Sequence, residues 1–192
     1  MDATEYRFEP VTAQRGADLD AFSRGHGKFR YCSCMRWRLT SAQYQKIGRD
    51  GRAAALRELV DSGEPTGVLA YQGEHAVGWC SIAPRDSYAA VLASRVIPRL
   101  PGAGVWSVVC FFLAPQARRR GLLPLLLEAA CTHAAQSGAR IAEAYPWPGG
   151  ASYRYMGTRE LYLAAGFHDM PVPDGCRPVM RRTLHPRPGS PA

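Results

Sequence analysis

The stretch that decides the fold lies at residues 105–124 and reads VWSVVCFFLAPQARRRGLLP. Its first nine residues are almost continuously apolar, which is typical of a central strand buried on both faces, and Pro115 ends that run. Pro124 is tolerated only in the first turn of a helix, so a helix must begin close behind Gly121. The stretch therefore predicts a buried strand, a short basic loop and a helix.

Three consecutive arginines, Arg118, Arg119 and Arg120, stand with Gly121 just before the predicted helix. The first turn of a helix exposes unpaired N–H groups and a partial positive charge, so it attracts anions. Gly121 lets the backbone approach a phosphate closely because it has no Cβ, and guanidinium groups bind phosphate through paired hydrogen bonds. We therefore expect a phosphate or pyrophosphate here; the alternative is that the arginines only keep the helix start solvated. The common nucleotide signatures Gly-x-x-x-x-Gly-Lys-Ser/Thr and Gly-x-Gly-x-x-Gly after a strand are absent.

Strands and helices are predicted along the rest of the chain from apolar periodicity and from the positions of glycine and proline. The expected strands are residues 6–12, 68–72, 76–82, 105–113, 141–145, 167–169 and 178–184. The expected helices are residues 17–24, two within 41–62 that divide at 48–51, 122–137 and 152–165. Residues 25–38 are expected to be irregular, and residues 84–104 to form a loop around a short helix. This order indicates a mixed α/β sheet with helices on both faces.

Composition narrows the classes of partner. The chain has 192 residues, which suits one domain, and a formal net charge of +8. No apolar run approaches the roughly 20 residues that cross a bilayer, and the first residues lack a signal segment, so we expect a cytoplasmic protein without a membrane partner. The basic residues are spread along the chain without a recognised binding motif, so we expect no nucleic-acid partner. Cys32 and Cys34 lack the second pair of ligands that a tetrahedral site needs, so no metal is expected.

The basic loop resembles a signature of the GNAT superfamily of acetyl-CoA-dependent N-acetyltransferases, Arg/Gln-x-x-Gly-x-Gly/Ala, which binds the CoA pyrophosphate. Arg118, Gly121 and Leu123 occupy its three fixed positions. Leu123 departs from the small residue of the signature, and Pro124 removes one backbone donor. A second match, ELYLAAGF at residues 160–167, resembles the Leu-Tyr-x-x-x-Gly-Phe ending of the superfamily's fourth helix.

The resemblance extends over residues 5–184, and stretches such as CSCMRW at residues 32–37 are similar to a bacterial subgroup of the superfamily. It implies an α/β (α+β) fold: a single GNAT-like domain at residues 1–184 with a central mixed, mostly antiparallel sheet of about seven strands and helices on both faces. Residues 185–192 include three prolines and are expected to form a flexible tail.

The resemblance also implies roles for individual residues, with acetyl-CoA as co-substrate. The backbone near Phe111 and Leu113 would pair with the pantetheine arm. The pyrophosphate would bind the loop and the helix start, at Arg118, Arg119, Arg120, Gly121, Leu122 and Leu123. Tyr162 would protonate the leaving thiolate, because a phenol carries a suitable proton. Glu143 is the nearest candidate for the base; its alternative role is an ion pair with a surface arginine.

The function that follows is direct transfer of an acetyl group from acetyl-CoA to a primary amine of a small-molecule acceptor. The aromatic and basic residues at 29–37 are expected to form a wall of the acceptor pocket, as this region does in the superfamily. A homodimer is left open. The alternative is a CoA-binding or catalytically inactive GNAT-like regulatory or interaction module, which the lack of a carboxylate at residues 106–113 favours.

Overall fold

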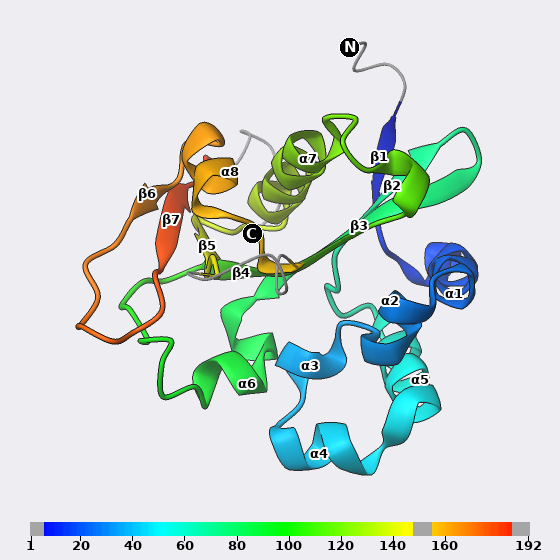
Figure 1. The fold of residues 1–192 in the computed structure, drawn as a ribbon, viewed down its shortest axis with the longest axis horizontal. Coiled ribbons are helices and arrows are strands. Elements are labelled where there is room, and N and C mark those ends of the chain that lie inside the picture. The colour runs from blue at the N-terminus through cyan, green and yellow to red at the C-terminus, as the bar shows by residue number, and fades with distance from the viewer. Residues whose placement is uncertain (1–5, 148–154, 186–192) are drawn as a thin grey trace.

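The structure is a computed structural model that describes residues 6–147 and 155–185. Within these residues seven strands form one sheet in the order β1-β2-β3-β4-β5-β7-β6 (Figure 1). The strands are β1 Arg7–Pro10, β2 Val68–Gln72, β3 His75–Pro84, β4 Val105–Leu113, β5 Ile141–Ala144, β6 His168–Asp169 and β7 Met180–Thr183. Strands β4 and β5 run parallel, and the other neighbouring strands are antiparallel. The predicted mixed, mostly antiparallel sheet is confirmed.

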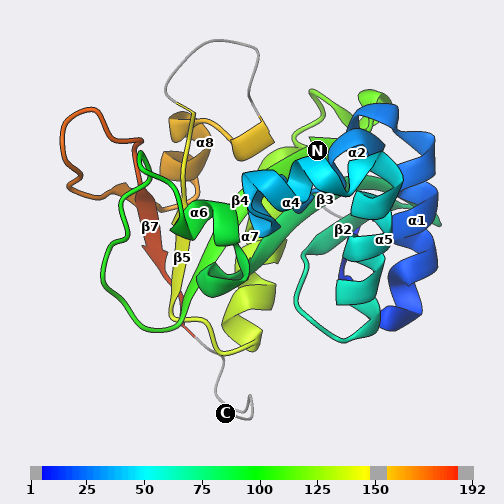
Figure 2. The same ribbon diagram turned by 90° about the horizontal axis from the view of Figure 1, so that it is seen from below.

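Helices cover both faces of this sheet, as predicted (Figures 1 and 2). One face carries α7 (Leu122–Gln136) and α8 (Arg159–Ala164). The opposite face carries α1 Gly16–Gly25, α2 Gly27–Cys32, α3 Met35–Arg38, α4 Ser41–Lys46, α5 Gly48–Asp61 and α6 Ala89–Leu92. Short 3-10 helices lie at Ala13–Arg15, Arg85–Ser87 and Pro115–Ala117. No helix among the described residues has the length and apolar character needed to cross a membrane.

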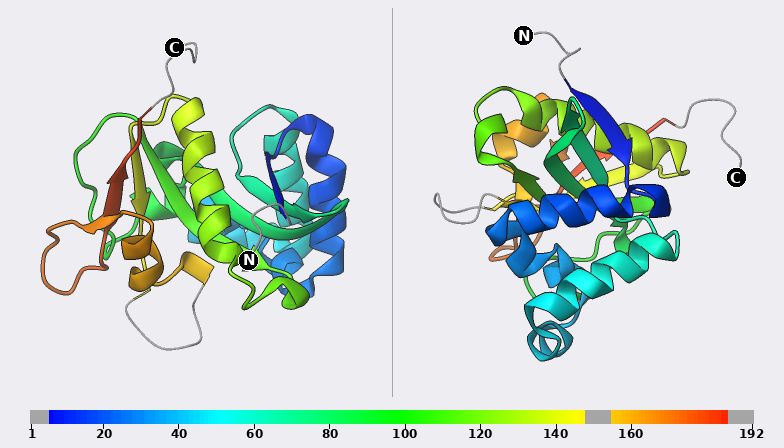
Figure 3. Two further views of the ribbon diagram at one scale, coloured as in Figure 1. Left: turned by 90° about the horizontal axis from the view of Figure 1, so that it is seen from above. Right: turned by 90° about the vertical axis from the view of Figure 1, so that its right-hand side faces the viewer.

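Each face of the sheet has its own apolar core. Helix α7 crosses one face and buries Leu122 and Leu126 against it (Figure 3). On the other face, Phe22 of α1 and Leu56 of α5 pack with Trp79 of β3. The buried side chains of α7 recur at helical spacing along one stripe, which is why this helix could be predicted from the sequence.

Strand β4 contains a bulge that decides which side chains face each core. Ser81 pairs with Cys110 and Ile82 pairs with Val108, so Val109 is the extra residue on β4. Beyond this bulge, Phe111 lies in the core beneath α7. Phe112 lies in the core beneath α1, α2 and α5.

The sheet is split where β4 and β5 part. The two strands pair only over Val105–Val108 and Ile141–Ala144. Residues 110–113 of β4 continue as strand and remain paired with β3, but neither they nor the bulge residue Val109 have a partner on β5. Because alternate backbone groups of a strand point to either side, part of this half of β4 offers its N–H and C=O groups to the split.

The prediction that residues 25–38 are irregular is wrong. They form α2 and α3, separated by Ser33 at φ 45° and Cys34 at φ 49°. Helices of six and four residues complete too few turns to show an apolar stripe, so periodicity could not reveal them. Their stability comes from tertiary packing, because Phe29 and Met35 are buried.

Helix α8 is shorter than the predicted helix at 152–165, of which residues 152–154 lie outside the described residues. Thr158 caps its start, because its hydroxyl accepts a hydrogen bond from the Leu161 amide at 3.3 Å. Gly166 follows its end at φ 79°, as predicted. Apart from His185, the predicted tail also lies outside the described residues.

Candidate active site

The basic loop leads directly from the end of β4 to the start of α7. Gly121 is the N-cap of α7 and has φ 69°, and Arg119 has φ 59°, a left-handed conformation that is uncommon for a residue with a side chain. Arg118, Arg119 and Arg120 are exposed. The first turn of α7 contains no acidic residue, so its partial positive charge is not neutralised locally.

Arg118 ties this loop to β4. Its Nε donates a hydrogen bond of 3.0 Å to the Leu113 carbonyl, and its guanidinium carbon lies 5.9 Å from the centre of the Phe112 ring. Leu122 is buried and Leu123 is half-buried. At these two positions a ligand would therefore meet backbone N–H groups rather than side chains.

Phe111, the other predicted cofactor residue on β4, also has a buried side chain. Its ring lies 6.4 Å from that of Tyr162 beneath α7 and α8. The side chain of Phe111 therefore belongs to the core, and a ligand at the split would meet only the backbone of this residue.

A pocket of about 680 Å³ opens on the opposite face of β4, beside the unpaired half of that strand. This volume suits a small-molecule ligand. The lining contains aromatic, cationic and sulfur-bearing side chains. They are Lys28, Phe29, Tyr31, Cys32, Cys34, Arg36, Trp37, Tyr44, Cys110, Phe112, Trp147, Tyr155, Met156 and Arg177.

The pocket wall agrees in part with the expectation for residues 29–37. Phe29, Tyr31 and Trp37 line the pocket, whereas Met35 is buried in the core. Tyr155 joins them from the segment before α8 and stacks on Phe112, with ring centres 6.3 Å apart and planes 4° apart.

Tyr162 lies in the core rather than in the pocket lining. Its hydroxyl donates a hydrogen bond of 2.7 Å to the carbonyl of Met156, which does line the pocket. Burial raises the pKa of Tyr162 well above its usual value, so the phenol is protonated at neutral pH. Gly157 lets the ring sit here, because a Cβ at this position would lie 2.9 Å from a Tyr162 ring atom.

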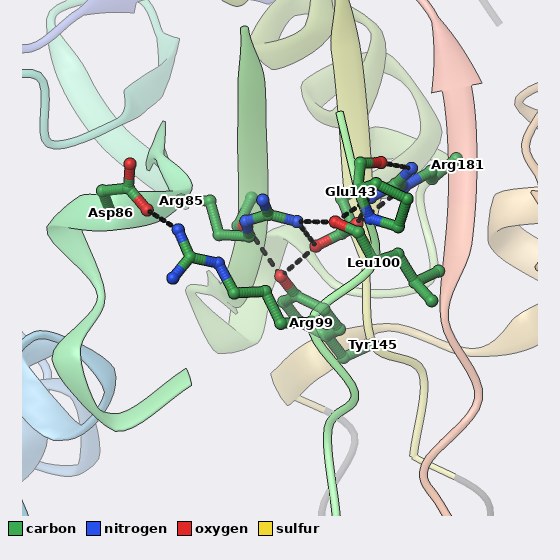
Figure 4. Close-up of polar contacts among 9 residues, drawn as sticks. Arg85, Asp86, Arg99, Leu100, Glu143, Tyr145 and Arg181 are labelled. Atoms are coloured by element: carbon green, nitrogen blue, oxygen red, sulfur yellow. Dashed lines mark hydrogen bonds and ion pairs between the residues drawn. The ribbon is translucent and has the colours of Figure 1, made fainter. Parts of the chain in front are cut away.

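Glu143 belongs to a buried polar network rather than to the pocket (Figure 4). Its Oε2 accepts from Nε of Arg181 at 2.7 Å, and its Oε1 lies 3.4 Å from Nη1 of Arg85. Tyr145 donates to Oε1 at 2.6 Å and also contacts the hydroxyl of Ser107 at 2.8 Å. The network joins β4, β5 and β7 in the part of the sheet where β4 and β5 are still paired.

This geometry assigns Glu143 a structural role. Its side chain is 1% exposed, and both of its oxygens face guanidinium groups. The cavity beside it measures only about 10 Å³, close to the space that one water needs and too small for an acceptor. Of the two roles considered for Glu143, the ion pair fits, although its partners are buried arginines rather than a surface arginine. Glu143 is therefore not assigned as the base.

Cys34, which borders the pocket, has a hydrogen-bond partner in the core. The thiol of Cys34 accepts a hydrogen bond of 3.0 Å from Nε1 of Trp79. Burial raises the pKa of Cys34 well above its usual value, which disfavours the thiolate that binds metals. Across the described residues, no group of three or more His, Cys, Asp or Glu side chains could hold a metal ion.

Several pocket residues were not singled out from the sequence. Lys28, Tyr44 and Arg177 come from different segments of the chain, whereas Arg36 belongs to the expected wall at residues 29–37. Cys110 lies in an apolar run that indicated a core residue. It is half-buried instead, and it borders the pocket because of the neighbouring bulge.

Comparison with known proteins places this arrangement in a class. The fold is similar to that of yncA from Salmonella typhimurium, bound to its cofactor acetyl-CoA (15% identity, TM-score 0.57, 98% of this chain and 99% of that chain). It is also similar to the paia N-acetyltransferase from Thermoplasma acidophilum in complex with coenzyme A (14%, 0.54, 93% and 99%). A third is the ribosomal-protein-alanine N-acetyltransferase from Brucella melitensis (18%, 0.56, 93% and 99%). A search of curated proteins found no match.

These three structures share the overall fold of this chain. Residues 33–167, more than two-thirds of the chain, match the model of the acetyltransferase (GNAT) family. The chain therefore belongs to the GNAT family and is an acetyltransferase.

Proposed function

We propose that this enzyme transfers an acetyl group from acetyl-CoA to a primary amine of a small-molecule acceptor by direct attack. The observation that carries the proposal is the half of β4 that has no partner on β5, which runs from the pocket to the head of α7. An extended ligand that pairs with this strand would place its two ends at an anion site and at a small-molecule pocket.

The residues present fit acetyl-CoA in two places and leave a separate pocket for the acceptor. The head of α7, with Gly121 and the arginines Arg118, Arg119 and Arg120, would hold the pyrophosphate. The backbone of residues 109–113 would pair with the pantetheine arm at the split. The acceptor would bind in the pocket on the other face of β4. The bound complexes of yncA and paia support the choice of acetyl-CoA.

Acetyl-CoA supplies an activated carbonyl in its thioester. The neutral amine attacks the carbonyl carbon, so a C–N bond forms and the C–S bond breaks. The amine gives up its proton to water, because the described pocket lining contains no carboxylate and no histidine. We propose that Tyr162 protonates the departing thiolate, since its phenol is held protonated. Its hydroxyl now donates a hydrogen bond to the carbonyl of Met156, the residue before Gly157.

The binding proposal is tested by thermal unfolding with acetyl-CoA. At a concentration 100 times Kd, binding stabilises by about 2.7 kcal/mol, which raises the Tm of a chain of this size by about 5–10 °C. Gly121→Ala should abolish this shift. Gly138→Ala is the matched control, because Gly138 follows the other end of α7 at φ 86° with open space around it. No shift in the unaltered protein would refute the proposal.

The chemical proposal is tested with Tyr162→Phe, which keeps the ring in place. Turnover should fall while acetyl-CoA affinity is retained; unchanged turnover would remove Tyr162 from the mechanism.

The competing function is a CoA-binding module without catalysis, which the absence of a side-chain base in the described lining favours. It predicts the thermal shift with acetyl-CoA but no acetylated product from any amine.

A further inference from the structure

One wall of the pocket is a row in which arginines alternate with aromatic rings. Arg36 lies 5.8 Å from the ring centres of both Trp37 and Tyr44. Arg177 continues the row, at 5.8 Å from Trp37 and 4.5 Å from the ring of Trp147. We call Tyr44, Arg36, Trp37, Arg177 and Trp147 the cation–aromatic row.

A buried arginine extends the charge behind this row. Arg52 is 7% exposed, and its guanidinium carbon lies 3.8 Å from the ring centre of Tyr44 and 5.2 Å from that of Tyr31. Its other contacts are the carbonyls of Tyr31, at 2.6 Å, and of Tyr44, at 3.2 Å. Neither contact brings a negative charge to the wall.

The described lining of the pocket carries positive but no negative side chains. It holds Lys28, Arg36 and Arg177 but no aspartate or glutamate. Lys28 and Arg36 take part in none of the ion pairs among the described residues. The pocket is therefore a site of positive potential.

A positive pocket restricts which amines can bind. An acceptor whose only charge is an ammonium group would be repelled, whereas an acid group on the same molecule would be attracted. Among the described residues, the Arg36 guanidinium contacts aromatic rings and no acidic side chain, which leaves its N–H groups for a planar acid. The same potential favours the uncharged form of the acceptor's amine, which is the form that attacks a thioester.

The remaining surface of the pocket suits a flat apolar body. Phe29, Phe112 and Tyr155 line it together with the rings of the row. Phe112 and Tyr155 stack in parallel, and Tyr155 is 41% exposed, so part of its ring is open to a planar ligand.

We infer that the acceptor is an aromatic amino acid in the broad sense: a small molecule that carries a primary amine and an acid group on an aromatic body. The cation–aromatic row binds the acid group through Arg36, and the aromatic lining holds the ring. This inference rests on the proposed function, because it takes the pocket as the acceptor site.

The test compares amines in pairs that differ only in the acid group. The pairs are 4-aminobenzoate with aniline, phenylalanine with phenethylamine, and tryptophan with tryptamine; spermidine and glycine represent a polycation and an acid without a ring. Release of CoA thiol and the mass of the product report transfer, and Tm in the presence of CoA reports binding. In at least one pair, kcat/KM for the acid-bearing member should be about tenfold higher or more, the value of one charged hydrogen bond.

The outcomes separate the two proposals. Binding of the acid-bearing compounds without thiol release from any amine refutes the transfer function and supports the pocket's preference. Thiol release that is as fast with phenethylamine, tryptamine or spermidine as with the acids refutes the inference and leaves the transfer function standing. Neither binding nor release of any compound, with acetyl-CoA bound, overturns both.

Arg36→Gln locates the preference on the row. In this variant the KM for the preferred acid should rise about tenfold. The KM for the matching compound without the acid group and the KM for acetyl-CoA should not change. Arg140→Gln is the matched control, because Arg140 is exposed just before β5, at the end of that strand remote from the split. A rise in the KM for acetyl-CoA in Arg36→Gln would assign this charge to the co-substrate and overturn the inference. Lys28→Gln provides a second test of the same kind.

Discussion

Replacement of Glu143 by glutamine is expected to lower the stability of the fold strongly and to leave the turnover of the folded enzyme intact. Glutamine keeps the shape and can still accept from Tyr145, but it removes the negative charge between Arg85 and Arg181. Those two side chains are each 8% exposed, so they would be left as buried, unneutralised cations. Breaking a buried ion pair on one side costs about 3–5 kcal/mol, which for this chain length lowers Tm by about 6–20 °C.

Thermal unfolding and initial rates, measured well below the lower Tm, separate stability from catalysis. The matched control is Glu128→Gln, because Glu128 pairs with Arg182, the neighbour of Arg181 on β7, through an equally short contact of 2.5 Å. The Glu128 side chain is 54% exposed, so this pair should contribute no more than about 1 kcal/mol. The two variants test the same chemistry in buried and exposed surroundings.

The reasoning would be refuted by the opposite pattern in Glu143→Gln. If Tm were unchanged and kcat fell by about a hundredfold or more, the size of a general-base contribution, Glu143 would be the base after all. Loss of both would be resolved by exchanging Arg85, Glu143 and Arg181 together for apolar residues. Well-packed apolar residues replace buried ionic clusters at little cost, so a triple variant that regains Tm and turnover confirms the structural role.

Two further predictions concern the loop and the face beneath α7. Arg119→Gly should raise Tm by about 2–4 °C, because glycine relieves a left-handed conformation that costs about 1 kcal/mol. The same change should weaken acetyl-CoA binding about tenfold, because it removes a positive charge. A lower Tm would contradict this prediction. Burial against Trp106 lowers the pKa of His133 below 6.5, so the unfolded chain takes up more protons below that pH, and stability should fall as pH drops from 7 to 5. His133→Phe should flatten this part of the pH dependence in denaturant titrations; an unchanged slope would count against it.

The parts of the fold that could be predicted are those with a local signal. The apolar run of β4, the three arginines and Pro124 mark a strand, a loop and a helix start within one short stretch, and the structure begins α7 at Leu122. The motif that includes Gly166 likewise located the end of α8. In each case neighbouring residues alone determine the conformation.

The parts that could not be predicted depend on residues far apart in the sequence. Glu143 lies 58 residues from Arg85 and 38 from Arg181, so no spacing rule pairs them. The cation–aromatic row combines Arg36 on α3 with Arg177 on the segment before β7. Aromatic and basic residues at 29–37 suggested a pocket wall, but only the fold shows that arginine and aromatic side chains alternate along it.

The pocket also gives the protein an optical signal of its own. Of its four tryptophans, Trp79 and Trp106 are buried in the two cores. Trp37 and Trp147 border the pocket, and Trp147 is 38% exposed. Indole emission depends on the polarity around the ring, so the unlabelled enzyme reports folding through one pair of tryptophans and pocket occupancy through the other.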